Sequence, residues 1–271
     1  MTTIDLNNDI NKLNDCIIHT LLKDKTTNNN ILDTVTYAAY ESMPELTPRS
    51  LRRKDENQKR SKDKAEIFTS IKIVKQMNDM VIEEYNKENH SFDEYIDSTQ
   101  LEITCGEGVF LTTRYDSETG EIINIPERVG LLDRKLWRLC SEISDKELFL
   151  KYLPRIAKSM YGYEYQGDSL LMARLNVLYS FIEYYQFKFD DTLPSYCLSE
   201  LVDIIACNIF QMDGLTMCIP QKDVIKTKDK KFKAVDGIAV KVNNWKENKT
   251  EFFDNERNVV VNPEPKQLSL F

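Results

Sequence analysis

The chain has 271 residues, of which 41% are hydrophobic, and a formal net charge of −8 at pH 7. This length corresponds to one large or two small domains with a proper core, and the negative charge argues against a broad nucleic-acid surface on this chain alone. No apolar run approaches the roughly 18 residues that span a bilayer, and no secretory signal follows Met1. Six cysteines without a Cys-x-x-Cys pair and only two histidines favour reduced thiols in a cytoplasmic protein without a zinc site.

The N-terminal third is expected to be mostly helical. Apolar residues at helical spacing predict helices over residues 4–22, 30–43 and 66–88, with a basic connection over 44–64. Residues 49–64 hold eight basic and three acidic side chains, and a later stretch, 222–233, holds six lysines and two aspartates. Each basic stretch is either a solvated face or mobile loop, or a segment that contacts phosphates.

The middle of the chain alternates strand-like apolar runs with helical periodicity, which is typical of an α/β domain. Ser144 is the expected cap of one helix, and Pro154 is expected to kink it. In chain order, the expected elements are a strand ending at Glu102, a hairpin over 114–127, helices over 130–143 and 144–160, a strand ending near Glu164, helices over 167–187 and 194–207, and a third strand.

The most informative string is 101–111, Leu-Glu-Ile-Thr-Cys-Gly-Glu-Gly-Val-Phe-Leu. It places an acid, Glu102, at the end of an apolar strand and then a Gly-x-Gly turn at Gly106 and Gly108. Glycine permits a positive φ and lets the backbone approach a ligand closely. A carboxylate above such a turn can accept a hydrogen bond from a ribose or an ammonium group. The string is therefore a candidate ligand-binding loop.

This string resembles the cofactor loop of the amino (adenine-N6) DNA methyltransferases, which bind S-adenosylmethionine. Three further strings resemble that family in the same order. Residues 65–70 are similar to its Phe-Thr-Pro motif, with Ser70 in place of the proline. Residues 161–164, Tyr-Gly-Tyr-Glu, are similar to the end of its second strand, and 208–215 to the end of its third. The whole resembles a family of short proteins labelled restriction endonuclease subunit M, over about residues 65–215.

The resemblance implies a set of cofactor-binding residues. Glu164 would hold the ribose hydroxyls, and Asp213 would contact the adenine amino group of the cofactor. Cys105 has two interpretations, a small residue that packs under the cofactor or a nucleophile, and the first is favoured. No metal is required, because the methyl group passes directly to an amine. Phe68 and Thr69 would close over the cofactor. The full implied set is Phe68, Thr69, Glu102, Cys105, Gly106, Gly108, Phe110, Glu164, Asp213 and Leu215.

The second signature of this family, (Asp/Asn/Ser)-Pro-Pro-(Tyr/Phe), does not occur in the sequence. In the family it holds the target amino group and stacks on a flipped base. Its nearest counterpart is Asn262, which is followed by Pro-Glu-Pro. This string is either a degenerate relic of the signature, with Asn262 as a catalytic candidate, or an accidental Asn-Pro in a disordered tail. Only 58 residues follow Asp213, too few to complete the sheet. The expected fold is therefore α/β, a partial Rossmann-like class I methyltransferase sheet with a helical N-terminal extension.

The last five residues, Gln-Leu-Ser-Leu-Phe, resemble the pentapeptide by which bacterial polymerases and repair proteins dock on the sliding clamp. A mobile tail would present Leu268, Leu270 and Phe271 to apolar pockets, and Gln267 would supply amide hydrogen bonds. The alternative is a C-terminal strand or a tail packed on its own domain.

Four segments result from these observations: 1–64, helices and a basic linker; 65–220, an S-adenosylmethionine-binding domain; 221–262, a Lys-rich segment and terminal strands; and 263–271, the tail. The leading hypothesis is a cofactor-binding chain of an adenine-N6 DNA methyltransferase or restriction–modification system. It would need a second methyltransferase or specificity subunit for catalysis, and would reach DNA in that complex. The alternative is a non-catalytic, methyltransferase-derived protein that binds a sliding clamp or a partner enzyme.

Overall fold

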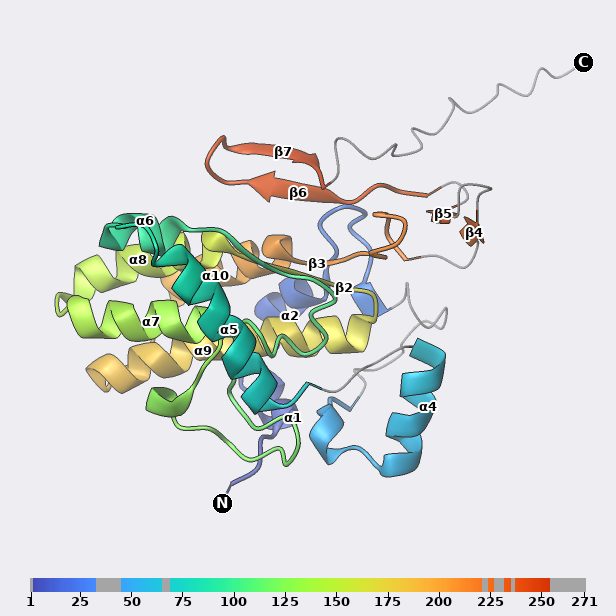
Figure 1. Ribbon diagram of the computed structural model, residues 1–271, viewed down its shortest axis with the longest axis horizontal. Coiled ribbons are helices and arrows are strands. Elements are labelled where there is room, and N and C mark those ends of the chain that lie inside the picture. The colour runs from blue at the N-terminus through green and yellow to red at the C-terminus, as the bar shows by residue number, and fades with distance from the viewer. Residues whose placement is uncertain are drawn as a thin grey trace, which may run out of the picture.

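A computed structural model describes residues 2–32, 45–64, 69–220, 224–226, 232–234 and 237–253 of the chain (Figure 1). In the described parts, no helix combines the length and apolar character needed to cross a bilayer. The helices, in chain order, are α1 (Leu6–Asn11), α2 (Asp15–Leu22), η1 (Arg49–Leu51), α4 (Lys54–Lys64), α5 (Ile71–Tyr85), α6 (Phe92–Asp97), η2 (Ile125–Glu127), α7 (Leu131–Glu142), α8 (Lys146–Ser159), α9 (Gly167–Phe189) and α10 (Ser195–Asn208). The strands are β1 (Gln100–Glu102), β2 (Met160–Glu164), β3 (Ile209–Gln211), β4 (Val224–Lys226), β5 (Phe232–Ala234), β6 (Lys241–Asn244) and β7 (Lys249–Phe252).

The centre of the fold is a three-stranded parallel sheet in the order β1-β2-β3. Glu102 of β1 is in register with Gly162 of β2, and Glu164 of β2 with Gln211 of β3. Helices α7 and α8 connect β1 to β2, and α9 and α10 connect β2 to β3. The predicted alternation of strands and helices is therefore confirmed as a mixed α/β fold, and the three predicted strand ends lie at one edge of the sheet.

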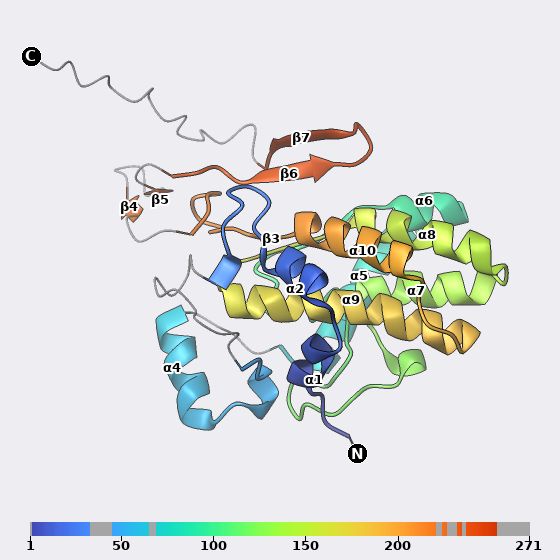
Figure 2. The same cartoon turned by 180° about the vertical axis from the view of Figure 1, so that it is seen from behind.

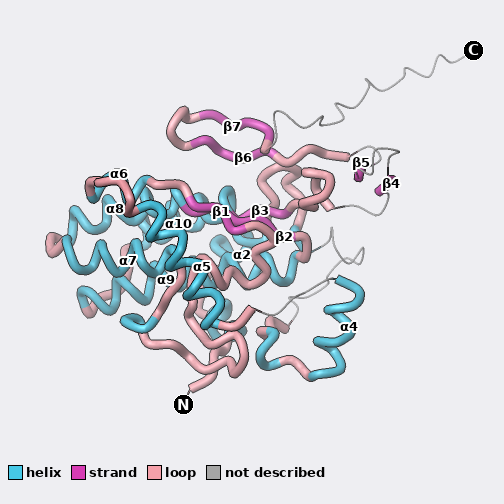
Figure 3. Tube along the Cα trace, in the orientation of Figure 1, coloured by secondary structure: helices cyan, strands magenta, loops and turns pink. Residues whose placement is uncertain are grey.

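Different elements cover the two faces of this sheet. The side chain of Met160 packs into the main hydrophobic core together with helices α7 to α10. Tyr163 and Phe210 point to the opposite face, where they form a smaller cluster with Met212, Ile219 and Val240. The β6–β7 hairpin lies on that second side, away from α9 (Figures 1 and 2), and the secondary-structure colouring separates the same layers (Figure 3). Side chains therefore alternate between two cores, as strand geometry requires.

The N-terminal helices belong to the main core. Leu21 of α2 is fully buried in it beside residues of α9 and α10. Arg174 of α9 is also fully buried, and its guanidinium donates to the carbonyls of Ile209 at 2.7 Å, Ala206 at 3.0 Å and Lys23 at 3.1 Å. The last carbonyls of a helix lack partners within the helix. Arg174 supplies donors to the ends of α2 and α10 and so joins them to the start of β3.

Most predicted helices are present, with shifted ends. The expected 66–88, 130–143, 144–160, 167–187 and 194–207 correspond to α5, α7, α8, α9 and α10. Two details were wrong. The helix over 4–22 is two helices, because Asn14 caps α2 by accepting from the Ile17 amide at 3.0 Å. The cap of α8 is Asp145, not Ser144, since its carboxylate accepts from the Leu148 amide at 2.7 Å. Pro154 lies within helix α8, and the kink expected there stays a prediction.

Two helices and one hairpin also differ from expectation. Part of the basic connection forms α4, whose sequence is polar throughout and so has no apolar periodicity to reveal it. Helix α6 was not predicted; a reciprocal capping box between Ser91 and Glu94 starts it. The expected hairpin over 114–127 reduces to a single bridge between Tyr115 and Ile122, and its second arm ends in η2. Of the helix predicted over 30–43, residues 33–44 lie outside the described ones.

Candidate functional site

The glycine loop follows β1 at the carboxyl edge of the sheet. Gly106 and Gly108 both have positive φ, +55° and +80°. A Cβ added to Gly108 would lie 3.5 Å from the side chain of Ala173 on α9, which is ordinary contact, so its backbone angle is the main requirement for glycine. A Cβ at Gly106 would meet no atom of the described residues within 4 Å. The loop is thus packed on α9 at one glycine and open at the other.

Glu102 holds the shape of this loop. Its side chain is buried, and its two oxygens accept from the amides of Phe110 at 3.1 Å and Leu111 at 3.0 Å. Burial raises the pKa of this carboxyl to about 8; the two amide bonds oppose the change and nearby Glu164 adds to it. Both acceptor atoms therefore serve the loop itself, and the predicted Phe110 is a partner of Glu102 through its backbone.

Glu164 ties the loop after β1 to the loop after β2. One oxygen accepts from the Gly106 amide at 2.9 Å and the other from the Gln166 amide at 2.9 Å. The Cys105 amide also donates to the Tyr163 carbonyl at 2.8 Å, which continues the contact between the two strands. The second predicted acid thus lies directly against the predicted glycine loop, between it and the first turn of α9.

Cys105 is a packing residue in this arrangement. Its side chain is buried, and its Sγ lies 3.3 Å from the position where a Cβ of Gly162 would be. Burial raises the pKa of the thiol well above its ordinary value, and the acids Glu102 and Glu164 act in the same direction. A nucleophilic cysteine requires a thiolate, so these surroundings favour the packing interpretation.

The third acid occupies a turn beside Glu164. The Met212 amide donates to the Glu164 carbonyl at 3.0 Å, so the chain after β3 stays next to the end of β2. Asp213 accepts from the Leu215 amide at 2.8 Å, and its own amide donates to the Cys218 carbonyl at 2.9 Å. Leu215 itself is exposed. Asp213 and Leu215 therefore lie at the same edge of the sheet as the glycine loop, in a separate turn.

The remaining predicted residues are only partly described. Thr69 contacts the segment that follows the glycine loop, because its carbonyl accepts from the Ser117 hydroxyl at 2.8 Å. Phe68, Asn262 and the tail residues Gln267, Leu268, Leu270 and Phe271 lie outside the described residues.

Sequence reasoning missed the role of Glu107, the residue between the two glycines. Its carboxylate accepts from the Arg49 amide at 2.7 Å and from the Tyr115 hydroxyl at 2.6 Å, and its carbonyl accepts from Asn176 at 2.9 Å. It therefore connects the loop to η1, to the following segment and to α9. The only signal in the sequence is an acid at the variable position of Gly-x-Gly, which by itself does not indicate partners so far along the chain.

The basic segment that contains α4 also contacts this edge. Arg60 forms an ion pair at 2.7 Å with Asp168, in the first turn of α9, and both side chains are largely shielded from solvent. Of the two interpretations of residues 49–64, neither a fully solvated face nor a phosphate contact describes Arg60, which is bound within the protein.

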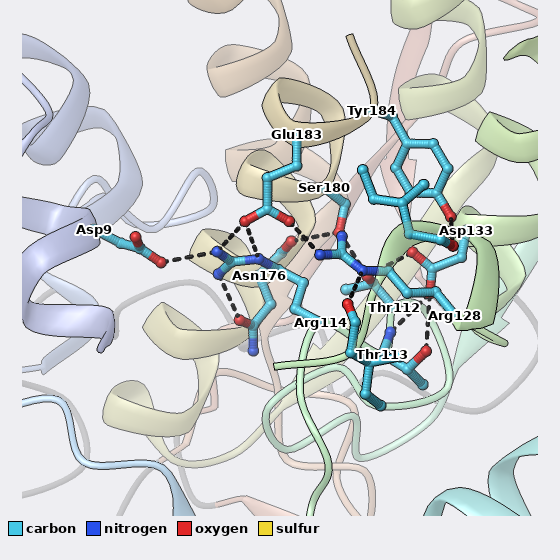
Figure 4. A network of polar contacts seen from close by, with 12 residues as sticks. Asp9, Thr112, Thr113, Arg114, Arg128, Asp133, Asn176, Ser180, Glu183 and Tyr184 are labelled. Atoms are coloured by element: carbon cyan, nitrogen blue, oxygen red, sulfur yellow. Dashed lines mark hydrogen bonds and ion pairs between the residues drawn. The ribbon is translucent and has the colours of Figure 1, made fainter. Parts of the chain in front are cut away.

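A buried polar network anchors the segment after the glycine loop (Figure 4). Arg114 donates to Asp9 of α1 at 3.0 Å and to Asn176 of α9 at 3.2 Å. Burial alone would raise the pKa of the Glu183 carboxyl on α9, but the guanidinium groups of Arg114 and Arg128 together lower this pKa. Asp133 of α7 accepts from the amides of Thr113 at 2.8 Å and Gly130 at 3.0 Å. Because α1, α7 and α9 all hold this segment, the glycine loop has a fixed support on its C-terminal side.

A cavity of about 540 Å³ lies elsewhere, beneath the β6–β7 hairpin. Thr99 and Ser159, which precede β1 and β2, are among its lining residues, so it lies toward the amino ends of these strands. No group of three or more His, Cys, Asp or Glu side chains is arranged for a metal ion within the described ranges.

Comparisons of the chain with protein-family models, with curated proteins and with solved structures give no match. The short strings and the geometry of the carboxyl edge are therefore the features that bear on function.

Proposed function

We propose that this chain binds S-adenosylmethionine at the carboxyl edge of β1–β3, as the cofactor-binding part of an adenine-N6 DNA methyltransferase. The observation that carries the proposal is the placement of two acids. Glu102 and Glu164 end adjacent parallel strands, and both bind backbone amides of the Gly-x-Gly loop, at 2.9 to 3.1 Å. Two terminal acids and a glycine turn at one sheet edge form the kind of site that binds a nucleoside with backbone and carboxylate groups.

The residues at this edge would have different roles toward the cofactor. Glu164 is the acceptor for the ribose hydroxyls, and Asp213 is the acceptor for the adenine amino group. Glu102 is a positioning residue, because it binds two loop amides and burial raises its pKa to about 8. Glu164 also binds two amides, and it would accept from the ribose through the second lone pair of each oxygen. Gly106 leaves an open side at which a ligand can approach the backbone. The bound cofactor supplies an activated methyl group.

Target recognition and methyl transfer are assigned to a complex. The sequence lacks the signature that orients a target amine, and positioning accounts for much of the rate in such transfers. A second methyltransferase or specificity subunit would supply it and would bring the chain to DNA. Residues 267–271 would bind a bacterial sliding clamp through the same apolar and amide contacts that the pentapeptide suggests.

A second candidate function has one observation in its favour. Both oxygens of Glu102 and both of Glu164 already accept hydrogen bonds from backbone amides. A fold derived from a methyltransferase could keep these bonds for stability alone and act as a non-catalytic interaction protein. The two functions differ in whether the folded chain binds S-adenosylmethionine.

Calorimetry with S-adenosylmethionine separates the two functions. The wild-type chain should give saturable heat, and at a ligand concentration of about 100 times the dissociation constant its free energy of unfolding should rise by about 2.7 kcal/mol. Asp213→Ala should weaken binding because it removes an acceptor for a polar group of the ligand. Glu83→Gln, an exposed acid on α5, is the matched control and should bind normally. A folded wild-type chain that gives no heat at millimolar ligand would favour the interaction protein.

A further inference from the structure

The cavity under the β6–β7 hairpin has fixed walls. Two hydrogen bonds fasten the hairpin to β2 and α10: Tyr161 of β2 donates from its hydroxyl to the Asn243 carbonyl at 2.9 Å, and the Trp245 indole donates to the side chain of Asn208 of α10 at 2.8 Å. Tyr161, Asn243 and Trp245 all line the cavity. The space is therefore held open by groups that are already paired, and a ligand would need little rearrangement to enter it.

Flat apolar side chains line this cavity. Trp245 and Tyr161 are partly buried in the protein and still line the space, as does Phe253. Leu101 of β1, which is 43% exposed, is a further apolar lining residue. The volume of about 540 Å³ lies within the range of roughly 300–1,000 Å³ that is usual for small-molecule sites. Aromatic side chains in such a space bind planar rings by stacking.

Cationic and acidic side chains also line the cavity. Arg155 is already neutralised by Asp93 at 2.6 Å and Asp97 at 2.7 Å. The ammonium group of Lys158 lies 5.5 Å from the centre of the Trp245 ring, and Lys246 is the next residue in the hairpin. The pairing of Lys158 with Glu200, at 3.5 Å between half-exposed side chains, is a weak surface contact. The ammonium groups of Lys158 and Lys246 are therefore available to bind an anion beside the aromatic side chains.

A buried lysine lies behind the cavity. Lys135 is 1% exposed and donates to the hydroxyl of Ser159, a lining residue, at 2.8 Å. Burial lowers its pKa to about 7; Asp97 opposes the change and Lys246 adds to it. Lys135, Lys158 and Lys246 thus lie at the same end of the sheet.

We propose that this cavity is a nucleotide site, in which the base lies against Trp245 and the phosphate faces Lys158 and Lys246. A nucleotide joins a planar aromatic ring to an anion over the short distance that separates these groups. The nucleotide is either free or part of a single strand. The site lies toward the amino ends of β1 and β2, whereas the glycine loop follows the carboxyl end of β1, so it binds independently of S-adenosylmethionine.

Tryptophan fluorescence tests this site directly. The chain has two tryptophans, and Trp137 is 41% exposed, so Trp137→Phe leaves Trp245 as the only reporter. Titration of that variant with dAMP should quench the fluorescence saturably, whereas adenosine and inorganic phosphate should each bind at least about 10-fold more weakly. A single-stranded tetranucleotide in place of dAMP assigns the source. Equal affinity indicates a free nucleotide, and tighter binding that weakens with salt indicates a strand.

Two double variants decide the proposal. In the Trp137→Phe background, Lys158→Ala with Lys246→Ala should weaken dAMP binding at least about 10-fold, which corresponds to about 1.4 kcal/mol. Lys12→Ala with Lys72→Ala removes two exposed lysines, one directly after α1 and one on α5, that do not line the cavity, and affinity should not change. Circular dichroism checks that both fold. The proposal is overturned by an absence of saturable quenching in the folded single variant, or by undiminished affinity after loss of Lys158 and Lys246.

Discussion

Replacing Glu102 by glutamine should remove a pH dependence of stability that this one side chain creates. The carboxyl is buried at the end of β1 and accepts from the amides of Phe110 and Leu111. Burial raises its pKa from 4.5 to about 8. Glutamine has nearly the same size and shape and does not ionise, so Glu102→Gln lacks the pH dependence. Its NH2 group cannot accept from one of the two loop amides, and this loss lowers the stability of the variant equally at every pH.

The sign and size of the effect follow from proton binding. In the unfolded chain this carboxyl loses its proton near pH 4.5, whereas in the folded chain it keeps the proton up to about pH 8. Between these values the folded state binds more protons, so the free energy of unfolding falls as pH rises. Each pKa unit corresponds to about 1.4 kcal/mol. Between about pH 5 and pH 7 the wild type should therefore lose roughly 3 kcal/mol relative to Glu102→Gln.

Urea unfolding, followed by far-ultraviolet circular dichroism, measures this difference. The free energy of unfolding is determined at about pH 5, 6 and 7 for the wild type, for Glu102→Gln and for the control Glu83→Gln. Glu83 is exposed on α5, so its variant should follow the wild type at every pH. The Glu102→Gln profile should be flatter than both. The m-values should agree, which shows that all three unfold from equally compact states.

One result would refute this reasoning. If the deficit of Glu102→Gln relative to the wild type grows as pH rises, the carboxylate is ionised in the folded chain at neutral pH. The amide bonds from Phe110 and Leu111 would then outweigh burial, and the loss of one charge-assisted bond in the glutamine variant would explain the deficit.

Four further outcomes are expected. Arg174→Met should lower the free energy of unfolding by at least about 3 kcal/mol, because it leaves several buried carbonyls without donors at roughly 1–3 kcal/mol each; an unchanged urea midpoint would contradict the account of the core. Burial lowers the pKa of Lys135 from 10.5 to about 7, so the free energy of unfolding of the wild type should rise with pH between these values, and Lys135→Met should abolish the rise. Urea unfolding at about pH 7 and pH 9 measures this, and a variant profile parallel to that of the wild type would contradict it. The purified chain alone should transfer no tritiated methyl group from S-adenosylmethionine to DNA, and transfer should appear when a partner that carries the missing signature is added; transfer by the single chain would instead make Asn262 the first residue to replace. In surface plasmon resonance, a peptide of residues 263–271 should bind a bacterial sliding clamp near micromolar affinity, about −8 kcal/mol, and Leu270→Ala with Phe271→Ala should abolish binding. A large loss of thermal stability in the full chain with those changes would show instead that the two side chains are anchored in the core.

Local patterns were sufficient to find most of the elements that build the site. The apolar runs that end at Glu102 and Glu164 indicated β1 and β2, and helical periodicity indicated α5 and α7 to α10. These signals are local because side-chain alternation and helical spacing depend on near neighbours in the chain. The glycine loop was recognisable for the same reason, since Gly106 and Gly108 both adopt the positive φ for which glycine is suited.

The tertiary structure decided which groups the site residues touch. Glu102 turns inward to loop amides, Glu164 reaches the Gly106 amide 58 positions away, and Arg114 pairs with Asp9 across 105 positions. Helix α4 was missed because its residues are polar throughout, and the cavity at Trp245 joins a late hairpin to the amino end of the sheet. Hydrogen-bond partners and burial depend on which distant segments the folded core brings together, and no local pattern of residues records that choice.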